Sequence, residues 1–213
     1  GFFYIALTKF VTHEVLNLSH LLAAYCSVLI ITLVGFLDDV NVKGSIRRGL
    51  KKWQKPLLTL PAAIPLMAMK IGNPTIYLPF VGNLHVGILY PLFFVPIGVM
   101  GAANMVNLLG GLNGLEAGMA IIYLSSLSLF SYLHTNSIAA KVIGFAALGA
   151  VIGFFPLNRY PAKFLPGDSF TYFLGSILAV IAIVGNMEKA AIIASGPFII
   201  EFLLKARGRF RIH

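Results

Sequence analysis

Uncharged apolar runs recur along the chain, and within each run the apolar residues are continuous rather than alternating with polar ones. A transmembrane helix needs roughly 20 such residues to cross about 30 Å of hydrocarbon, and several runs approach that length. Strands of a membrane β-barrel would alternate instead, so a barrel is not favoured. The pattern predicts an all-α polytopic membrane protein with about seven transmembrane helices, at residues 16–37, 57–69, 86–107, 117–133, 142–157, 170–186 and 190–200.

The segment 42–55, between the first two runs, has a different pattern. Its apolar residues stand three or four positions apart with basic residues between them, which fits a short amphipathic helix in the membrane interface. A solvated basic loop is an equal alternative, because Gly44 and Gly49 disfavour a helix. The apolar residues concerned are Val42, Ile46, Leu50 and Trp53.

Two short apolar segments, 75–80 and 84–88, stand on either side of Val81-Gly82-Asn83. Apolar segments separated by such turn residues are typical of a β-hairpin. We therefore expect a small hairpin or a turn between the second and third spans.

Composition and charge place the bundle in a membrane and orient it. Of 213 residues, 58% are hydrophobic and 11% are charged, unlike the usual composition of soluble domains. The net charge of +9 is concentrated in three basic clusters, so no nucleic acid is expected as a partner. With seven spans the clusters share one side, which the positive-inside rule makes cytoplasmic, leaving residues 1–15 and the hairpin outside. The clusters are Lys43, Arg47, Arg48, Lys51, Lys52 and Lys55; Arg159 and Lys163; and Lys205, Arg207, Arg209 and Arg211.

Cysteine and histidine chemistry is not expected to carry the function. Cys26 is the only cysteine in the sequence, which excludes a disulfide within the chain and a cysteine metal cluster. The five histidines have no paired ligand spacing, so a zinc site is not favoured.

Carboxylates gather at one membrane face instead. Four of the seven acidic residues fall at the predicted cytoplasmic span ends, where ionisable groups are costly unless they are paired or functional. Carboxylate and amide oxygens suit Mg²⁺, and the nearby lysines and arginines suit phosphate oxygens. The combination indicates phosphoryl transfer, although basic residues also set topology and bind anionic lipid headgroups. The four are Asp38, Asp39, Glu116 and Asp168.

Three motifs give this interpretation its specificity. They are Gly-Phe-Leu-Asp38-Asp39-Val, the asparagine- and glycine-rich segment 104–118, and Phe-Leu-Pro-Gly-Asp168-Ser-Phe. In this order and with this topology, the sequence resembles the polyprenyl-phosphate N-acetylhexosamine-1-phosphate transferases. Asn-Gly-Leu-Glu and the arginine-rich end are more similar to the eukaryotic and archaeal UDP-GlcNAc:dolichyl-phosphate branch. The bacterial UDP-MurNAc-pentapeptide translocases usually have aspartates at the positions of Gly110 and Asn113.

The resemblance implies roles for the residues that match its motifs. Asp168 and Asn107 would hold Mg²⁺, for which Mn²⁺ can substitute, against the pyrophosphate of the donor. Asp38 and Asp39 would serve the lipid phosphate, and Lys55, matched through Lys-Pro-Leu-Leu, would contact phosphate. Asp38, Asp39, Lys55 and Asp168 are thus the expected catalytic residues.

A second group of residues is expected to bind the donor. Gly111 and Asn113 would surround the uracil, and the two arginines near the end of the chain would bind pyrophosphate or sugar. The expected substrate-binding residues are Asn104, Gly111, Asn113, Glu116, Arg207 and Arg209.

The expected reaction transfers GlcNAc-1-phosphate from UDP-GlcNAc to dolichyl or another polyprenyl phosphate for glycan assembly, and releases UMP. Alternatives are another UDP-N-acetylhexosamine, a transporter and a non-catalytic scaffold, but no carboxylate stands near the middle of a span as a transport relay would require. The active site would face the cytoplasm, at the plasma membrane in an archaeon or bacterium and at the endoplasmic reticulum in a eukaryote. A homodimer is left open.

Relatives of this kind have two further spans before this region and one after it. We therefore expect residues 1–213 to form one membrane-embedded catalytic domain, as a fragment of a ten-helix fold.

Overall fold

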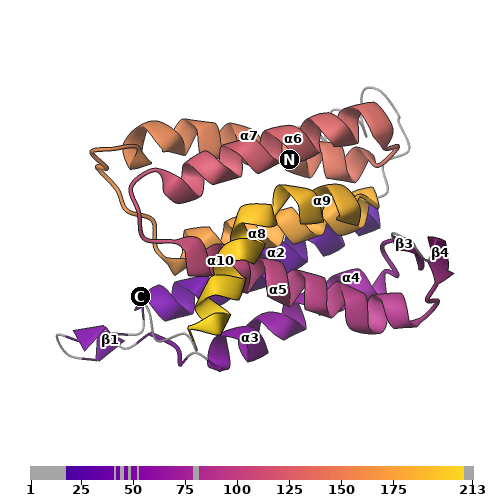
Figure 1. Ribbon diagram of the computed structural model, residues 1–213, viewed down its shortest axis with the longest axis horizontal. Coiled ribbons are helices and arrows are strands. Elements are labelled where there is room, and N and C mark those ends of the chain that lie inside the picture. The colour runs from indigo at the N-terminus through magenta and orange to yellow at the C-terminus, as the bar shows by residue number, and fades with distance from the viewer. Residues whose placement is uncertain are drawn as a thin grey trace.

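The computed structural model describes residues 18–40, 42, 43, 46, 47, 49–51, 53–78 and 82–208. Long helices dominate this part of the chain (Figure 1). A π-helical turn, η3 (Tyr90–Phe94), leads directly into the long helix that begins at Val95. The long helices are α2 (Leu18–Val40), α5 (Val95–Leu109), α6 (Leu115–His134), α7 (Ile138–Asn158) and α8 (Asp168–Gly185).

These helices have the length and surface of membrane spans. Within the described residues, five segments are long and apolar enough to cross a membrane: α2, η3 with α5, α6, α7 and α8. Their outer faces expose large apolar side chains such as Leu29, Ile97, Ile122 and Ile152. Soluble monomers rarely expose apolar surface on this scale, whereas lipid covers it. The chain is therefore a polytopic all-α membrane protein.

The predicted count of seven spans is corrected to five helices of spanning length in the described residues. The run at 57–69 forms three short pieces, α3 (Gln54–Thr59), the 3₁₀-helix η2 (Leu60–Ala63) and α4 (Ile64–Ala68). Each of the last two begins with a proline in its first turn. Proline lacks the amide donor that a continuous helix needs, so hydropathy alone overestimates this span.

The run at 190–200 is divided in the same way. It forms α9 (Glu188–Ala194) and α10 (Gly196–Arg207), which meet at Ser195. Pro197 stands in the first turn of α10, where its missing amide proton costs nothing. The two helices change direction at this point rather than forming one span (Figure 1).

Helix α8 lies at the centre of the bundle, and most of its residues are buried. Two glycines let its neighbours approach closely. A Cβ atom at Gly35 of α2 would lie 2.7 Å from the carbonyl oxygen of Asp168, and one at Gly175 of α8 would lie 2.5 Å from that of Ala102 in α5. Because these obstacles are backbone atoms, larger residues would push α2 and α5 away from α8.

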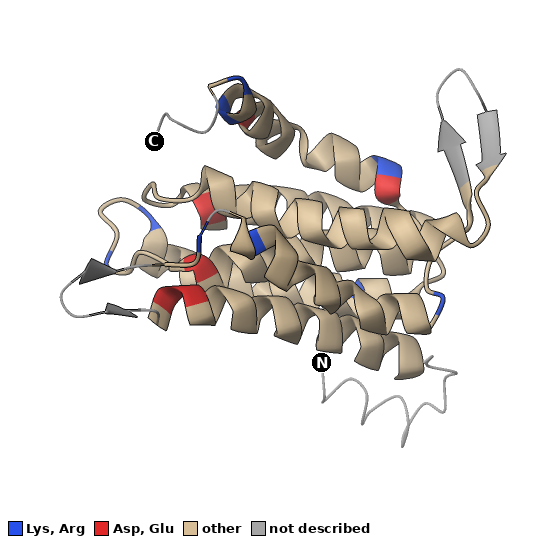
Figure 2. Cartoon of the chain, turned by 90° about the horizontal axis from the view of Figure 1, so that it is seen from below, with Lys and Arg blue, Asp and Glu red and all other residues tan. Residues whose placement is uncertain are grey.

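The two ends of the bundle differ in charge. Most of the coloured acidic positions gather at one end, which we call the polar end (Figure 2). Asp38 lies near the end of α2, and Glu116 and Asp168 lie in the first turns of α6 and α8. The C-terminal ends of α2, α5 and α7 meet the N-terminal ends of α3, α6 and α8 there (Figure 1). The opposite end, which carries the β3–β4 hairpin, is called the hairpin end.

The predicted hairpin is confirmed. Strands β3 (Thr75–Leu78) and β4 (Gly82–His85) pair antiparallel, with Leu78 opposite Gly82. The predicted interfacial helix over 42–55 is wrong for the described part of that segment, because β1 (Val42–Lys43) pairs antiparallel with β2 (Ile46–Arg47). The described residues 49–51 of this segment belong to neither a helix nor a strand.

Candidate active site

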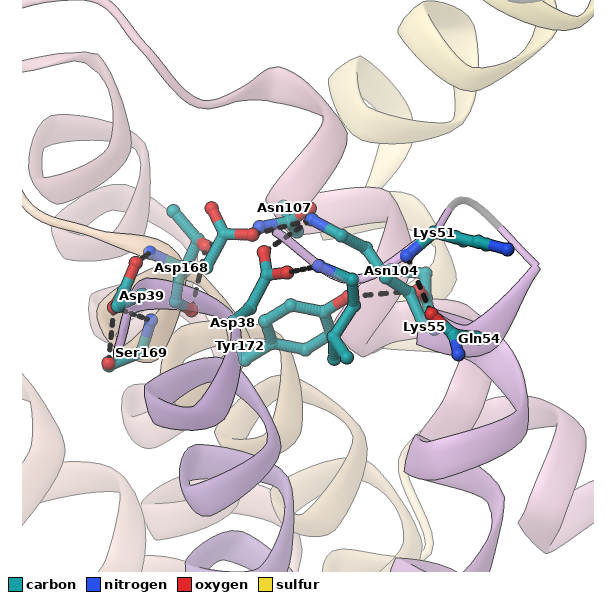
Figure 3. Close-up of polar contacts among 12 residues, drawn as sticks. Asp38, Asp39, Lys51, Gln54, Lys55, Asn104, Asn107, Asp168, Ser169 and Tyr172 are labelled. Carbon is teal, nitrogen blue, oxygen red and sulfur yellow. Dashed lines mark hydrogen bonds and ion pairs between the residues drawn. The ribbon is translucent and has the colours of Figure 1, made fainter. Parts of the chain in front are cut away.

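A lysine joins two carboxylates at the polar end of the bundle. The Nζ atom of Lys55, in the first turn of α3, lies 2.7 Å from Oδ2 of Asp38 and 2.6 Å from Oδ2 of Asp168. Asp38 comes from the end of α2 and Asp168 begins α8, so three helices meet at one ammonium group (Figure 3). Two carboxylates sharing one lysine retain a formal negative charge and attract a further cation.

The charge of Lys55 is maintained by this pairing. Burial alone would lower its pKa, but the hydrogen bonds to Asp168 and Asp38 and the attraction of their charges raise the pKa of Lys55 above its ordinary value. Lys55 is therefore a cation at neutral pH. A positively charged amine between two carboxylates is suited to contact phosphate oxygens.

Asp38 is also held by the backbone that follows β2. The amide of Leu50 donates to Oδ1 of Asp38, while Oδ2 accepts from Lys55. A Cβ atom at Gly49 would lie 2.8 Å from Oδ1 of Asp38, so glycine is what lets this segment pass so close. The side chain of Asp38 is only 7% exposed, with both oxygens engaged.

Asp39 makes a different set of contacts. Its Oδ1 accepts from the amide of Asp168 at 2.8 Å, and its Oδ2 accepts from the amide of Ser169 at 2.9 Å. The hydroxyl of Ser169 also donates to Oδ2. Asp39 is thus adjacent to Asp38 in the sequence but bound to the backbone of α8 (Figure 3).

Asn107, near the end of α5, lies beside the first turn of α8. Its Nδ2 donates to Oγ1 of Thr171 at 2.9 Å, and Thr171 in turn donates to the carbonyl of Asp168 at 3.1 Å. This commits the amide nitrogen and turns the amide oxygen away from Thr171. Within the described residues no hydrogen bond reaches that oxygen, so it is available to a cation.

Asn104, which is expected to bind substrate, joins three helices one turn further into the bundle. Its Nδ2 donates to Oγ1 of Thr59 at 3.1 Å and to the carbonyl of Met100 at 2.8 Å. Its Oδ1 accepts from the hydroxyl of Tyr172 at 3.3 Å. Through these hydrogen bonds Asn104 links α5 to α3 and α8.

The glycine-rich loop after α5 is shaped by Glu116. Gly111 has a φ of +115°, a conformation that favours glycine, and its amide donates to Oε1 of Glu116. A Cβ atom at Gly110 would lie 3.3 Å from both Oε1 of Glu116 and the methyl group of Thr171, so the loop lies against α8. Glu116 is buried, whereas Gly111 and Asn113 are exposed and face solvent.

The C-terminal basic residues are only partly placed. Arg207 is exposed at the end of α10, and Arg209 lies outside the described residues. Sequence reasoning missed Lys205, whose Nζ donates to the carbonyl of Leu108, next to Asn107, and lies 3.1 Å from Oε1 of Glu201. Glu201 and Lys205 stand four residues apart, a spacing at which side chains on a helix meet, but nothing local in the sequence indicates the contact with α5.

The donor set fits a magnesium ion that substrate oxygens complete. Within the described residues no group of three or more His, Cys, Asp or Glu side chains is arranged to enclose a metal. Mg²⁺, however, commonly takes one or two carboxylates, several waters and substrate phosphates rather than a full protein cage. Asp168 and the amide oxygen of Asn107 provide hard oxygen ligands of this kind. The ammonium group of Lys55 already occupies a cationic position between Asp38 and Asp168.

Comparison with known proteins supports this interpretation. Residues 21–186 match the family model described as glycosyl transferase family 4. A Saccharolobus solfataricus protein with the provisional name UDP-N-acetylglucosamine–dolichyl-phosphate N-acetylglucosaminephosphotransferase is 37% identical over 191 residues, which are 89% of this chain and 57% of that protein. A Sulfolobus acidocaldarius protein of the same provisional name is 36% identical over 187 residues, 87% of this chain and 55% of its own length.

A bacterial relative is less similar. The phospho-N-acetylmuramoyl-pentapeptide-transferase of Clostridium beijerinckii is 31% identical over 183 residues, which are 83% of this chain and 56% of that protein. The chain thus spans about half the length of the curated relatives it matches.

Proposed function

The chain belongs to glycosyl transferase family 4, and from this premise we propose that it transfers N-acetylglucosamine-1-phosphate from UDP-N-acetylglucosamine to dolichyl phosphate or a similar polyprenyl phosphate. The products would be UMP and a lipid-linked diphosphate sugar for glycan assembly. The observation that carries this proposal is the bridge from Lys55 to Asp38 and Asp168, at one end of a membrane bundle. It combines phosphate-binding and metal-binding groups where a lipid phosphate and a soluble nucleotide can both arrive.

In this reaction an oxygen of the lipid phosphate attacks the phosphorus that carries the sugar. A new P–O bond forms, the bond from this phosphorus to the bridging oxygen breaks, and UMP leaves with the electron pair. Positioning and neutralisation of charge account for most of the acceleration in such transfers. Lys55 would contact the phosphate oxygens, and Asp38 would orient the lipid phosphate and accept its proton where one is present. A covalent aspartyl intermediate is an alternative route.

Asp168 and Asn107 would hold Mg²⁺ or Mn²⁺ against the pyrophosphate of the donor. Bound there, the ion supplies positive charge to the transferred phosphoryl group and the leaving UMP. The contact between Asn107 and Thr171 directs the amide nitrogen away from that position and so favours the amide oxygen as ligand.

The exposed loop after α5 is the proposed site of the nucleotide. Gly111 and Asn113 would surround the uracil, and the buried carboxylate of Glu116 would hold the backbone of Gly111 in place. Arg207 and Arg209 would approach the pyrophosphate or the sugar from the end of α10. Lys205 keeps α10 close to α5 through the carbonyl of Leu108, which supports this arrangement.

We place the polar end in the cytoplasm, because basic residues of all three clusters belong to segments at that end. The membrane would be the plasma membrane in an archaeon or bacterium and the endoplasmic reticulum in a eukaryote. Single cysteines at Ser45, Arg159 and Gly208, introduced after replacement of Cys26, should react with an impermeant thiol reagent from the cytoplasm. A cysteine at Asn83 should react from outside, and the reverse pattern would overturn the orientation.

The activity is tested by incubating membranes that carry the protein with labelled UDP-GlcNAc, a polyprenyl phosphate and Mg²⁺. The expected products are UMP and a lipid of the added mass, identified by mass spectrometry. Parallel reactions with UDP-GalNAc and UDP-MurNAc-pentapeptide decide which sugar is preferred. Uptake of label without a new lipid product would instead support a transporter.

A further inference from the structure

The two adjacent aspartates at the end of α2 make different kinds of contact. Asp38 faces the ammonium group of Lys55, which it shares with Asp168. Asp39 accepts hydrogen bonds from the amides of Asp168 and Ser169 at 2.8 and 2.9 Å and from the hydroxyl of Ser169. All of its donors belong to the first two residues of α8. Asp38 and Asp39 therefore do not belong to one shared group of contacts.

Asp39 occupies the position of a helix cap that α8 does not supply for itself. The first amides of a helix have no partner within it, and a side chain just before the helix usually accepts from them. Here the capping position is Gly167, which has no side chain, and no local side chain caps the helix. A carboxylate from another helix fills this role, and the positive end of the helix dipole favours its charge.

The surrounding backbone is shaped for this contact on both sides. A Cβ atom at Gly167 would lie 2.5 Å from each carboxylate oxygen of Asp39. A Cβ atom at Gly35, one turn before Asp39 on α2, would lie 2.7 Å from the carbonyl oxygen of Asp168 and from the Cα atom of Ser169. Side chains at either glycine would separate the carboxylate from the amides that it binds.

We propose that Asp39 is a positioning residue that anchors the start of α8 to the end of α2 and thereby sets the place of Asp168. Asp39 binds through both carboxylate oxygens to the backbone amides that begin α8, whereas Asp38 faces the ammonium group of Lys55. We therefore assign the role of base to Asp38 and a structural role to Asp39. Asp168, whose own amide is bound by Asp39, is held within reach of Lys55 as a result. The effect of Asp39 on catalysis rests on the proposed function, whereas the anchoring of α8 by Asp39 does not.

A substitution series separates this role from a chemical one. Asparagine is itself a good helix cap: its oxygen accepts from an amide and its nitrogen can donate to the hydroxyl of Ser169. Asp39→Asn should therefore retain about a tenth or more of wild-type turnover, whereas Asp39→Ala should lose about 100-fold. Asp38→Asn, in contrast, should be as inactive as Asp38→Ala, because a general base contributes about 100- to 10,000-fold.

Equal inactivity of Asp39→Asn and Asp39→Ala, at normal expression and folding, would overturn the proposal, because a base or nucleophile tolerates neither change. Near-normal turnover in Asp39→Ala would overturn it as well. Wild-type membranes that form no lipid product from any UDP-sugar would refute the proposed function instead.

Amide hydrogen exchange tests the anchoring without any assay of activity. In the purified protein, the backbone of residues 168–171 should exchange faster in Asp39→Ala than in the wild type, and at an intermediate rate in Asp39→Asn. Asp38→Ala is the matched control, because it removes the neighbouring carboxylate and leaves the cap in place. Unchanged exchange at 168–171 in Asp39→Ala would show that Asp39 does not anchor α8.

Discussion

The two ends of the bundle use their ionisable groups in opposite ways. At the hairpin end, Glu188 at the start of α9 accepts from the hydroxyl of Tyr90, which ties α9 to the turn before α5. At the polar end, Asp38 and Asp168 share Lys55, and Oε2 of buried Glu116 has no partner among the described residues. The contact at the hairpin end joins two elements through one hydrogen bond, whereas the polar end keeps a buried carboxylate oxygen without a partner and two carboxylates that share one cation.

This difference indicates where a ligand is expected. Incompletely paired acidic groups near hydrocarbon cost free energy, so we expect them where a bound cation or a hydrogen-bond donor of a ligand completes their pairing. The hairpin end holds α9 close to the start of α5 but has only one carboxylate among the described residues, that of Glu188. The contrast predicts that substitutions of equal chemistry will abolish activity at one end and leave it intact at the other.

Removal of divalent cations should have the largest effect. Turnover should fall to background in excess EDTA and return with Mg²⁺ or Mn²⁺, because hard oxygen ligands suit these ions. The measurement is product formation in membranes over a range of free metal concentrations. Full turnover in EDTA would contradict the metal assignment of Asp168 and Asn107.

Asp168→Asn should have the next largest effect, a loss of turnover of about 1,000-fold, because it removes a metal-binding charge and leaves a side chain of the same size. Glu188→Gln is the matched control at the hairpin end, since its amide oxygen can still accept from Tyr90. This variant should stay within about threefold of wild type. Comparable losses in both, at equal expression, would break the distinction between the two ends.

Lys55→Met should reduce turnover by about 100-fold, because it leaves two carboxylates without their shared cation. Lys55→Arg should recover part of this loss, since a guanidinium can also pair with both carboxylates but needs more room. Kinetics with each substrate varied separately would show whether the lipid or the donor is affected. Equal activity of Lys55→Met and wild type would remove Lys55 from the site.

Arg207→Lys should have a smaller effect, about fivefold on the KM for UDP-GlcNAc, because lysine keeps the charge but not the planar pair of donors. Lys163, in the basic loop before α8, provides a control in Lys163→Arg. An unchanged KM in both variants would leave Arg207 as a residue that only orients α10.

Tyr90→Phe should leave turnover unchanged and lower stability by about 1 kcal/mol, because it removes one hydrogen bond at the hairpin end. Thermal unfolding in detergent measures the loss. A fall in turnover without a fall in stability would connect the hairpin end to catalysis and so weaken the comparison.

Much of the fold was predictable because its signals are local. Continuous apolar runs identified the five long spans, and Val81-Gly82-Asn83 identified the hairpin. Hydropathy does not show where a helix ends. It therefore could not reveal that the apolar runs are interrupted near Pro61 and at Ser195. The paired strands β1 and β2 lie in a basic segment whose apolar spacing resembled that of a helix.

The site was predictable in composition but not in roles. Asp38, Lys55 and Asp168 come together as their motifs implied. Sequence motifs could not separate Asp38 from Asp39, because the difference depends on how α2 packs against α8. The contacts of Asn104 could not be predicted for a similar reason, since its partners Thr59 and Tyr172 are 45 and 68 residues away.

The close approaches at the glycines have a consequence for genetic suppression. Gly35 and Gly175 face backbone atoms, whereas a Cβ atom at Gly144 would meet the side chain of Ser128, at 2.5 Å from its hydroxyl oxygen. A damaging Gly144→Ala allele can therefore be rescued by Ser128→Ala on the facing helix. No single replacement removes a main-chain atom, so selections for revertants of Gly35→Ala or Gly175→Ala should return only glycine at the original codon.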